Sequence, residues 1–172
     1  MMRILILASL VSGIAISVPK IVDGRLEKTV DSKPQATAMA VKTPVSYSSG
    51  RDVVLTADAR GHFVGKFKIN GRKVDGLIDT GATAVAINRS TARKLGVSVT
   101  PGMFKYRVST ANGATKAARV ELRSVELGPI RVRDVEAFVL DDNSLGGMLV
   151  GMSFLNRLKS FQARDGKLVL KR

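Results

Sequence analysis

The sequence predicts a mainly β domain with one or two short helices, closed into a barrel or packed as a sandwich. Short runs of strand-forming residues follow one another from about residue 51 to the end, and turn-forming pairs with glycine separate them at even spacing. The chain has 172 residues, which is enough for one ordinary domain but not for two large ones. Aromatic residues make up only 5%, so the core must consist mainly of Val, Leu, Ile and Ala.

Turn residues divide the first half of this domain into elements. Asn70-Gly71 is a two-residue hairpin turn, because both of its positions must tolerate a positive φ angle. Ser90 is the expected N-cap of a short helix that Gly96 terminates. The strands expected here are 62–69, 73–78 and 85–87, and the helix is 91–95.

The second half follows the same pattern. Ala111-Asn112-Gly113 is the expected tip of a second hairpin, and Gly128-Pro129 is the next turn. Ser153 is the expected N-cap of a further short helix, and Asp165-Gly166 makes the last hairpin. The strands expected here are 104–110, 114–127, 130–140 and 167–170, with an apolar, glycine-rich segment at 145–152 and a helix at 154–158.

The N-terminal 50 residues have a different composition. Residues 4–18 are almost entirely apolar and follow a single positive charge, so residues 1–19 are predicted to be a secretory signal peptide or, alternatively, an uncleaved membrane anchor. Residues 20–50 lack hydrophobic periodicity and contain scattered Pro, Ser and charges, as flexible linkers do. The domain is therefore expected at 51–172, in the cell envelope. In a bacterium this means the periplasm, or the inner membrane facing the periplasm, with membrane association through residues 4–18.

Charge and residue types exclude several classes of function. The formal net charge is +14, and residues 51–172 alone carry 22 basic and 11 acidic side chains, or 22 − 11 = +11. This balance attracts anionic surfaces, but no basic run is interleaved with stacking aromatics, which disfavours nucleic acid as a partner. The absence of Cys and the single His, His62, exclude thiolate sites and make a His-based metal cluster or a Ser-His-Asp triad improbable. We therefore expect no metal and no cofactor, and we expect His62 to be an ordinary strand residue.

One stretch of the sequence contains candidate catalytic residues. In Leu77-Ile78-Asp79-Thr80-Gly81-Ala82-Thr83, an apolar strand delivers an Asp directly into a Thr-Gly turn. A simple turn after a strand would also suit these residues, so the context decides. Leu149-Val150-Gly151, later in the chain, is a second apolar segment that ends in glycine.

In this context the chain resembles the retropepsin-like aspartic proteases over about 61–170. Asp79-Thr80-Gly81-Ala82 resembles the catalytic turn, Leu149-Val150-Gly151 the segment behind it, and Ala111-Asn112-Gly113 occupies the place of the flap hairpin. The resemblance is closest to bacterial single-domain members. It departs from the retroviral members at Met152-Ser153, where they have Arg followed by Asn or Asp, and at the flap tip, which has only one Gly.

The resemblance implies a closed β barrel of the acid-protease fold that works as a homodimer on polypeptide substrates. The implied catalytic residues are Asp79, Thr80 and Gly81. The implied substrate-binding residues are Ala82, Asn112, Gly113, Leu149, Val150 and Gly151.

The chemistry itself also requires two chains. Peptide hydrolysis without a metal needs a general base for water and a general acid for the carbonyl oxygen, and two adjacent carboxylates that share one proton supply both. The sequence has no second Asp-Thr-Gly or Asp-Ser-Gly, because Asp75-Gly76 and Asp165-Gly166 lack the hydroxyl residue. The partner carboxylate is therefore expected from Asp79 of a second copy.

Three functions remain in view. The leading hypothesis is an exported or membrane-tethered aspartic endopeptidase. The first alternative is a catalytically silent protease-fold module for dimerisation or peptide binding at the membrane surface. The second alternative is a basic domain that binds the envelope through its charge.

Overall fold

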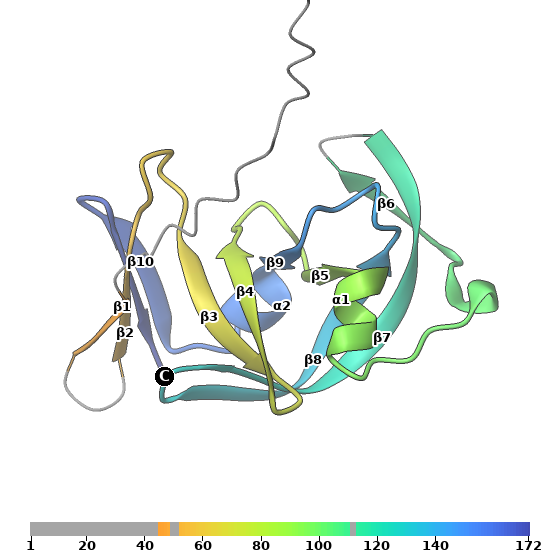
Figure 1. The fold of residues 1–172 in the computed structure, drawn as a ribbon. Helices are drawn as coiled ribbons and strands as arrows, with labels where there is room; N and C mark the ends of the chain where they lie inside the picture. Colours follow the sequence, from red (N-terminus) through yellow and green to blue (C-terminus); the bar gives the residue numbers. More distant parts are fainter. Residues whose placement is uncertain (1–44, 49–51, 111–112) are drawn as a thin grey trace, which may run out of the picture. The chain divides into compact units, whose positions relative to one another are not determined.

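The computed structural model describes residues 45–48, 52–110 and 113–172 (Figure 1). The predicted signal or anchor, the predicted linker as far as residue 44, and Ala111 and Asn112 at the hairpin tip lie outside the described residues. In chain order the elements are β1 (Val45–Ser48), β2 (Asp52–Thr56), β3 (Val64–Ile69), β4 (Arg72–Ile78), β5 (Val85–Asn88), α1 (Arg89–Lys94), the 3-10 helix η1 (Pro101–Met103), β6 (Tyr106–Thr110), β7 (Gly113–Leu127), β8 (Ile130–Leu140), β9 (Met148–Val150), α2 (Met152–Leu155), β10 (Ser160–Arg164) and β11 (Lys167–Lys171).

The larger sheet closes into a barrel, as the sequence predicts. Its strand order is β3-β4-β9-β5-β8-β7, and a further pairing of β3 with β7 closes the ring, while β6 pairs only with β7. The β4–β9 and β5–β8 pairs are parallel, and the other pairs are antiparallel. Strand β6 and the start of β7 form a short hairpin that extends beyond the closed barrel (Figure 1).

Alternation of apolar residues builds the barrel core. In β3 the residues Gly65, Phe67 and Ile69 are buried and the lysines between them are exposed, so one face of the strand is apolar. Phe67 meets Phe154 of α2 edge to face, with ring centroids 6.0 Å apart. Helix α2 therefore contributes an aromatic side chain to the barrel core.

The smaller sheet has the order β1-β2-β11-β10. Its buried residues Val53, Leu55, Leu168 and Leu170 belong to the same apolar cluster as the barrel core. Strand β1 falls inside the segment 20–50 for which composition predicts a linker, and it pairs with β2 in antiparallel register. The ordered sheet thus begins before residue 51.

The glycine turns are formed as predicted. Asn70 and Gly71 have φ angles of 49° and 90°, and Asp165 and Gly166 have 50° and 68°, which are the left-handed values that two-residue hairpins need. Gly96 ends α1 with φ at 70°. His62, by contrast, precedes β3 instead of lying within it, and its backbone N–H donates to Asp58 Oδ1 at 2.9 Å.

Both predicted helices exist, but neither is capped by the predicted serine. The N-cap of α1 is Asn88, whose side chain accepts a hydrogen bond from the Thr91 N–H, and the N-cap of α2 is Gly151. Ser90 and Ser153 instead bond to residues far away in the sequence, as described below. Among the described residues, no helix is long and apolar enough to cross a membrane.

Candidate active site

The main chain fixes Asp79 at the end of β4. Strand β4 runs parallel to β9, and the ladder continues one step further, because the Asp79 N–H donates to the Val150 carbonyl oxygen at 3.1 Å. The Asp79 side chain is fixed as well, since its Oδ1 accepts a hydrogen bond of 2.8 Å from the Gly81 N–H. The turn therefore holds the carboxylate in one orientation, in which Oδ1 is bound by the Gly81 N–H and Oδ2 is not bound by the turn.

Gly151 packs directly behind this turn. A Cβ atom on Gly151 would lie 2.4 Å from both the Ala82 and the Ala84 carbonyl oxygens, so no other residue fits without moving the backbone. This close approach allows the Met152 N–H to donate to the Ala82 oxygen at 2.8 Å and the Ser153 N–H to the Thr83 oxygen at 3.1 Å. The segment after β9 thus supports the turn from the rear.

Ser153 connects the segment behind the turn to two strands of the barrel. Its Oγ accepts a hydrogen bond of 2.9 Å from the Val85 N–H and donates one of 2.8 Å to the Glu136 carbonyl oxygen. Ser153 therefore bridges β5 and β8, and this explains why it does not cap α2.

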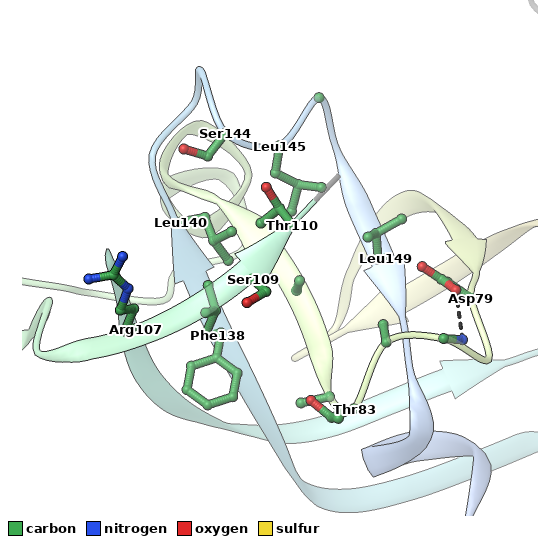
Figure 2. Close-up of a pocket in the computed structure, with 16 residues that line it drawn as sticks. Asp79, Thr83, Arg107, Ser109, Thr110, Phe138, Leu140, Ser144, Leu145 and Leu149 are labelled. Atoms are coloured by element: carbon green, nitrogen blue, oxygen red, sulfur yellow. Dashed lines mark hydrogen bonds between the residues drawn. The ribbon is translucent and has the colours of Figure 1, made fainter. Parts of the chain in front are cut away.

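A cleft of about 910 Å³ opens in front of Asp79 (Figure 2). Of the residues predicted for the site, Asp79, Gly81, Ala82 and Leu149 line it. Thr80 is exposed on the turn outside the lining, and Gly113 begins β7 just beyond it. Val150 and Gly151 are buried behind the turn and do not reach the cleft, while Asn112 is outside the described residues.

Other lining residues were not singled out from the sequence. They come from the turn itself, from β5, from β6, from β8 and from the loop before β9: Thr83, Ala84, Ala86, Arg107, Val108, Ser109, Thr110, Phe138, Leu140, Ser144, Leu145 and Gly146. Most of them are apolar or small, so the cleft suits apolar side chains. The predicted strands at 85–87, 104–110 and 130–140 contain several of these residues, but a strand alone does not place a residue in a cleft.

The cleft contains very few charges. Among the lining residues that the structure describes, Asp79 is the only carboxylate and Arg107 the only cation. In the described part of the chain, no three His, Cys, Asp or Glu side chains gather as they would to hold a metal ion. One carboxylate facing a largely apolar cleft can accept a proton from water, but a single group cannot also serve as the acid.

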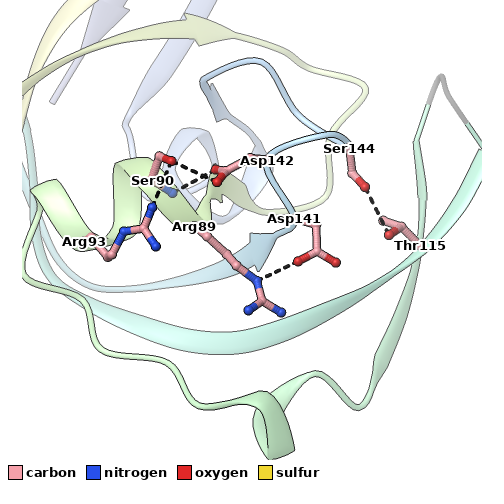
Figure 3. Close-up of polar contacts among 7 residues, drawn as sticks. All are labelled: Arg89, Ser90, Arg93, Thr115, Asp141, Asp142 and Ser144. Atoms are coloured by element: carbon pink, nitrogen blue, oxygen red, sulfur yellow. Dashed lines mark hydrogen bonds and ion pairs between the residues drawn. The ribbon is translucent and has the colours of Figure 1, made fainter.

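Polar contacts hold the loop at 141–147, which forms one wall of the cleft (Figure 3). Asp142 accepts two hydrogen bonds of 2.8 Å, from the Ser90 N–H and the Ser90 hydroxyl. These bonds hold the pKa of Asp142 below its usual value, the backbone bond being the larger cause. Ser144 bonds Thr115 of β7 at 3.2 Å, so the loop also contacts the second strand of the hairpin.

Arg89 strengthens the same wall from α1. Its Nε forms an ion pair of 2.6 Å with Asp141 Oδ1, and its guanidinium lies 4.0 Å from the centroid of the Phe104 ring. The start of α1, the segment before β6 and the cleft loop are thereby joined. Side-chain contacts, and not sheet hydrogen bonds, therefore position this wall of the cleft.

Comparisons with known proteins agree with this geometry. The model of the gag-polyprotein putative aspartyl protease family matches residues 65–157. A retropepsin-like aspartic protease from Rickettsia conorii, solved by crystallography, superposes with a TM-score of 0.62 at 32% identity, over 74% of this chain and 92% of that one.

Two curated relatives are longer proteins whose names call them uncharacterised. One, from the cobV 5′ region of a Sinorhizobium species, is 36% identical over 75% of this chain and 56% of its own length. The other, from Rickettsia prowazekii, is 31% identical over 69% of this chain and 51% of its own length. The chain thus spans about half the length of the curated relatives it matches.

Proposed function

Because the chain belongs to the gag-polyprotein-type, retropepsin-like aspartyl protease family, we propose that it is an aspartic endopeptidase whose active site forms across a homodimer. The family and the closed-barrel fold that the sequence predicts are confirmed by the comparisons. The observation that carries the proposal is that Asp79, fixed by the Gly81 N–H, is the only carboxylate that the described residues place in the cleft.

The proposed chemistry uses Asp79 of each copy in a different role. One Asp79 takes a proton from the attacking water while the other gives a proton to the oxygen of the scissile carbonyl, which yields a tetrahedral gem-diol. Two carboxylates about 3 Å apart cannot both ionise readily, so they share the one proton that this division of roles requires. The Asp79 that took the proton then gives it to the leaving nitrogen, while the other Asp79 takes a proton back from a gem-diol hydroxyl. The C–N bond breaks, a carboxylic acid and an amine are released, and the pair again holds one shared proton.

The exposed part of the turn is suited to contact a second copy. Thr80 and Gly81 are both exposed, next to the fixed carboxylate, and are free to face their counterparts across a twofold axis. A Cβ atom on Gly81 would lie 3.2 Å from Asp79 Oδ1 and would crowd the hydrogen bond that orients the carboxylate. We assign Thr80 to bracing the two turns and Gly81 to their close approach.

The hairpin of β6 and β7 is proposed to hold the substrate. An extended peptide lying between this hairpin and the turn can pair with backbone groups near Asn112 and Gly113, as an added strand does. Ala82 and Leu149, which line the cleft beside Asp79, would then contact the side chains that flank the scissile bond. Backbone pairing supplies affinity, and the apolar lining supplies selectivity.

The test is peptide cleavage by Asp79→Asn. Asn keeps nearly the same shape but cannot take a proton from water, so the rate of cleavage should fall by about 10²–10⁴-fold or more while folding and dimerisation persist. Asp75→Asn is the matched control, since Asp75 is an exposed carboxylate on β4 that pairs with Lys66 outside the cleft. A wild-type chain that dimerises but cleaves nothing in a broad peptide library would instead favour the silent protease-fold module.

Export to the cell envelope is part of the proposal. The apolar run at 4–18 supports it, as a signal or as an anchor. A reporter enzyme that is active only outside the cytoplasm, fused after Arg172, should be active. A fusion made in normal amounts but inactive would contradict export.

A further inference from the structure

A second hollow of about 490 Å³ lies away from the catalytic cleft and is lined almost entirely by arginine. Its lining consists of Arg131, Val132, Arg133, Arg157 and Arg172. Val132 is 6% exposed and forms an apolar floor, while the four arginines are exposed around it. No acidic side chain of the described residues lines this hollow.

Three separate segments bring the arginines together on an ordered backbone. Arg131 and Arg133 are two residues apart on β8, so their side chains stand on one side of the strand. Arg157 follows α2, and its N–H donates to the Phe154 carbonyl oxygen at 3.1 Å. Arg172 follows β11, whose Lys171 oxygen accepts a hydrogen bond of 3.0 Å from the Lys159 N–H, so the end of β11 lies beside the segment that carries Arg157.

The positive charge of the hollow is largely uncompensated. Arg131 pairs with Glu126 at 3.0 Å, but Arg133, Arg157 and Arg172 form no ion pair with any residue in the described part of the chain. Guanidinium groups gathered without acidic partners raise the local positive potential and attract anions. Each guanidinium also presents a planar fork of donors that matches two oxygens of a phosphate group.

The hollow is separate from the catalytic cleft. Arg133 lies five residues from Phe138, the cleft-lining residue nearest to it along β8, which is about 16 Å measured along the strand. Figure 1 shows the turn between β7 and β8 and the C-terminus at one end of the barrel, away from β6. The two sets of lining residues have no member in common.

We propose that this arginine hollow is a binding site for a phosphate group that carries two or more negative charges. The phosphate can belong to a soluble oligophosphate or to the headgroup of an acidic phospholipid, because the arginines recognise the same group in both. The site acts independently of peptide cleavage.

The test is calorimetric titration of the full chain with pyrophosphate at constant ionic strength. The wild-type chain should bind, and Arg133→Gln/Arg157→Gln should bind at least tenfold more weakly. The matched control is Arg60→Gln/Arg164→Gln, which removes the same charge from exposed arginines outside the hollow and should bind like wild type. Arg133→Lys/Arg157→Lys keeps the charge but loses the fork, should bind with intermediate affinity, and serves as the test if the Gln variant does not fold.

Three results would overturn the proposal: no binding by the wild type, unchanged binding by the hollow variants, or equal weakening in the control, which would show a general effect of charge. Vesicles of phosphatidylcholine with and without phosphatidic acid distinguish the two sources of phosphate. If the chain binds the vesicles with phosphatidic acid more strongly, and the gain requires Arg133 and Arg157, the phosphate belongs to a lipid headgroup. If the chain binds pyrophosphate but shows no such gain, the phosphate is soluble. Peptide cleavage should stay at the wild-type rate in the Gln variant, so failure here is distinguishable from failure of the protease proposal.

Discussion

The orientation of the Asp79 carboxylate depends on two glycines that act in different ways. Gly81 supplies the N–H that binds the carboxylate, and its lack of a side chain keeps the space beside the Asp79 oxygen open. Gly151 lets the segment after β9 approach the turn from behind, at a distance that excludes any Cβ atom. The first glycine orients the carboxylate, and the second fixes the backbone that carries it.

Gly151→Ala should therefore destabilise the fold. The new methyl group would overlap two carbonyl oxygens, and overpacking of this kind lowers the free energy of unfolding by about 1–3 kcal/mol. Gly147→Ala is the control, because a Cβ atom there meets nothing within 4 Å. Urea denaturation of both variants checks the expectation, and a Gly151→Ala protein as stable as wild type would mean that the turn is not packed as described.

Single residues also mark what a sequence can and cannot predict. The Asn70-Gly71 turn was predictable because a positive φ angle is a local demand that few residue types meet. The prediction that Ser90 and Ser153 cap helices is wrong, because a serine can cap a helix or bond elsewhere and only the tertiary fold decides. Ser90 bonds Asp142, which is 52 residues away in the sequence, and Ser153 bonds Val85, which is 68 residues away.

Among the elements, the loop at 141–147 shows how the cleft wall depends on its neighbours. It contacts α1 through the bonds from Ser90 to Asp142, and it contacts β7 through the bond of Ser144 to Thr115 (Figure 3). Neither contact belongs to a sheet ladder. A change of charge at Asp142 should therefore loosen a wall of the cleft without disturbing the barrel.

Protonation of Asp142 should reveal this link as a pH dependence. Its pKa is lowered in the folded state by the Ser90 N–H and hydroxyl, so it stabilises the fold at pH values above the unfolded pKa near 3.8, and this contribution is lost as the pH falls through the lowered folded value. Asp142→Asn should be less stable than wild type near pH 6, and the difference should shrink below about pH 4. Thermal unfolding across this range measures it.

Ser90→Ala provides the matched variant for this prediction. Because it removes the hydroxyl hydrogen bond to Asp142, it should reduce the same pH-dependent difference, and the double variant Ser90→Ala/Asp142→Asn should lose less than the sum of the two single variants. Additive losses would show that the two residues do not act through each other.

The cleft could be predicted only in part, because the sequence does not show which strands and loops pair in space. The β6–β7 hairpin could be predicted from its turn, but Phe138 and Ser144 could not be placed at the site. They reach it because β8 runs parallel to β5, and because the β8–β9 loop returns over the cleft. Such pairings join residues about 50 positions apart and have no local signature in the sequence.

At the scale of the whole molecule, β1 shifts the boundary of the folded domain. It pairs with β2 from Val45↔Leu55 to Ser48↔Asp52, so the edge of the smaller sheet includes residues that composition assigns to the linker. A chain starting at residue 44 should unfold cooperatively at the temperature of the full chain. A chain starting at residue 51 should keep its cooperative transition at a lower temperature, because β2 loses the backbone hydrogen bonds on one side. Equal transition temperatures for the two shortened chains would show that β1 contributes nothing to stability.

The central claim is that two copies share one catalytic pair of Asp79 residues, and subunit mixing tests it most directly. Wild-type and Asp79→Asn chains are mixed in varying ratios, exchange is verified by energy transfer between labelled subunits, and peptide cleavage is measured. With equal amounts and random exchange, about a quarter of the dimers remain fully wild type, so activity should fall to about half of that expected for independent chains. In the control mixtures of wild-type and Asp75→Asn chains, the activity per total amount of chain should be the same at every ratio. A strictly linear dependence on the wild-type fraction, with exchange verified, would mean that each chain cleaves alone and would contradict the shared pair.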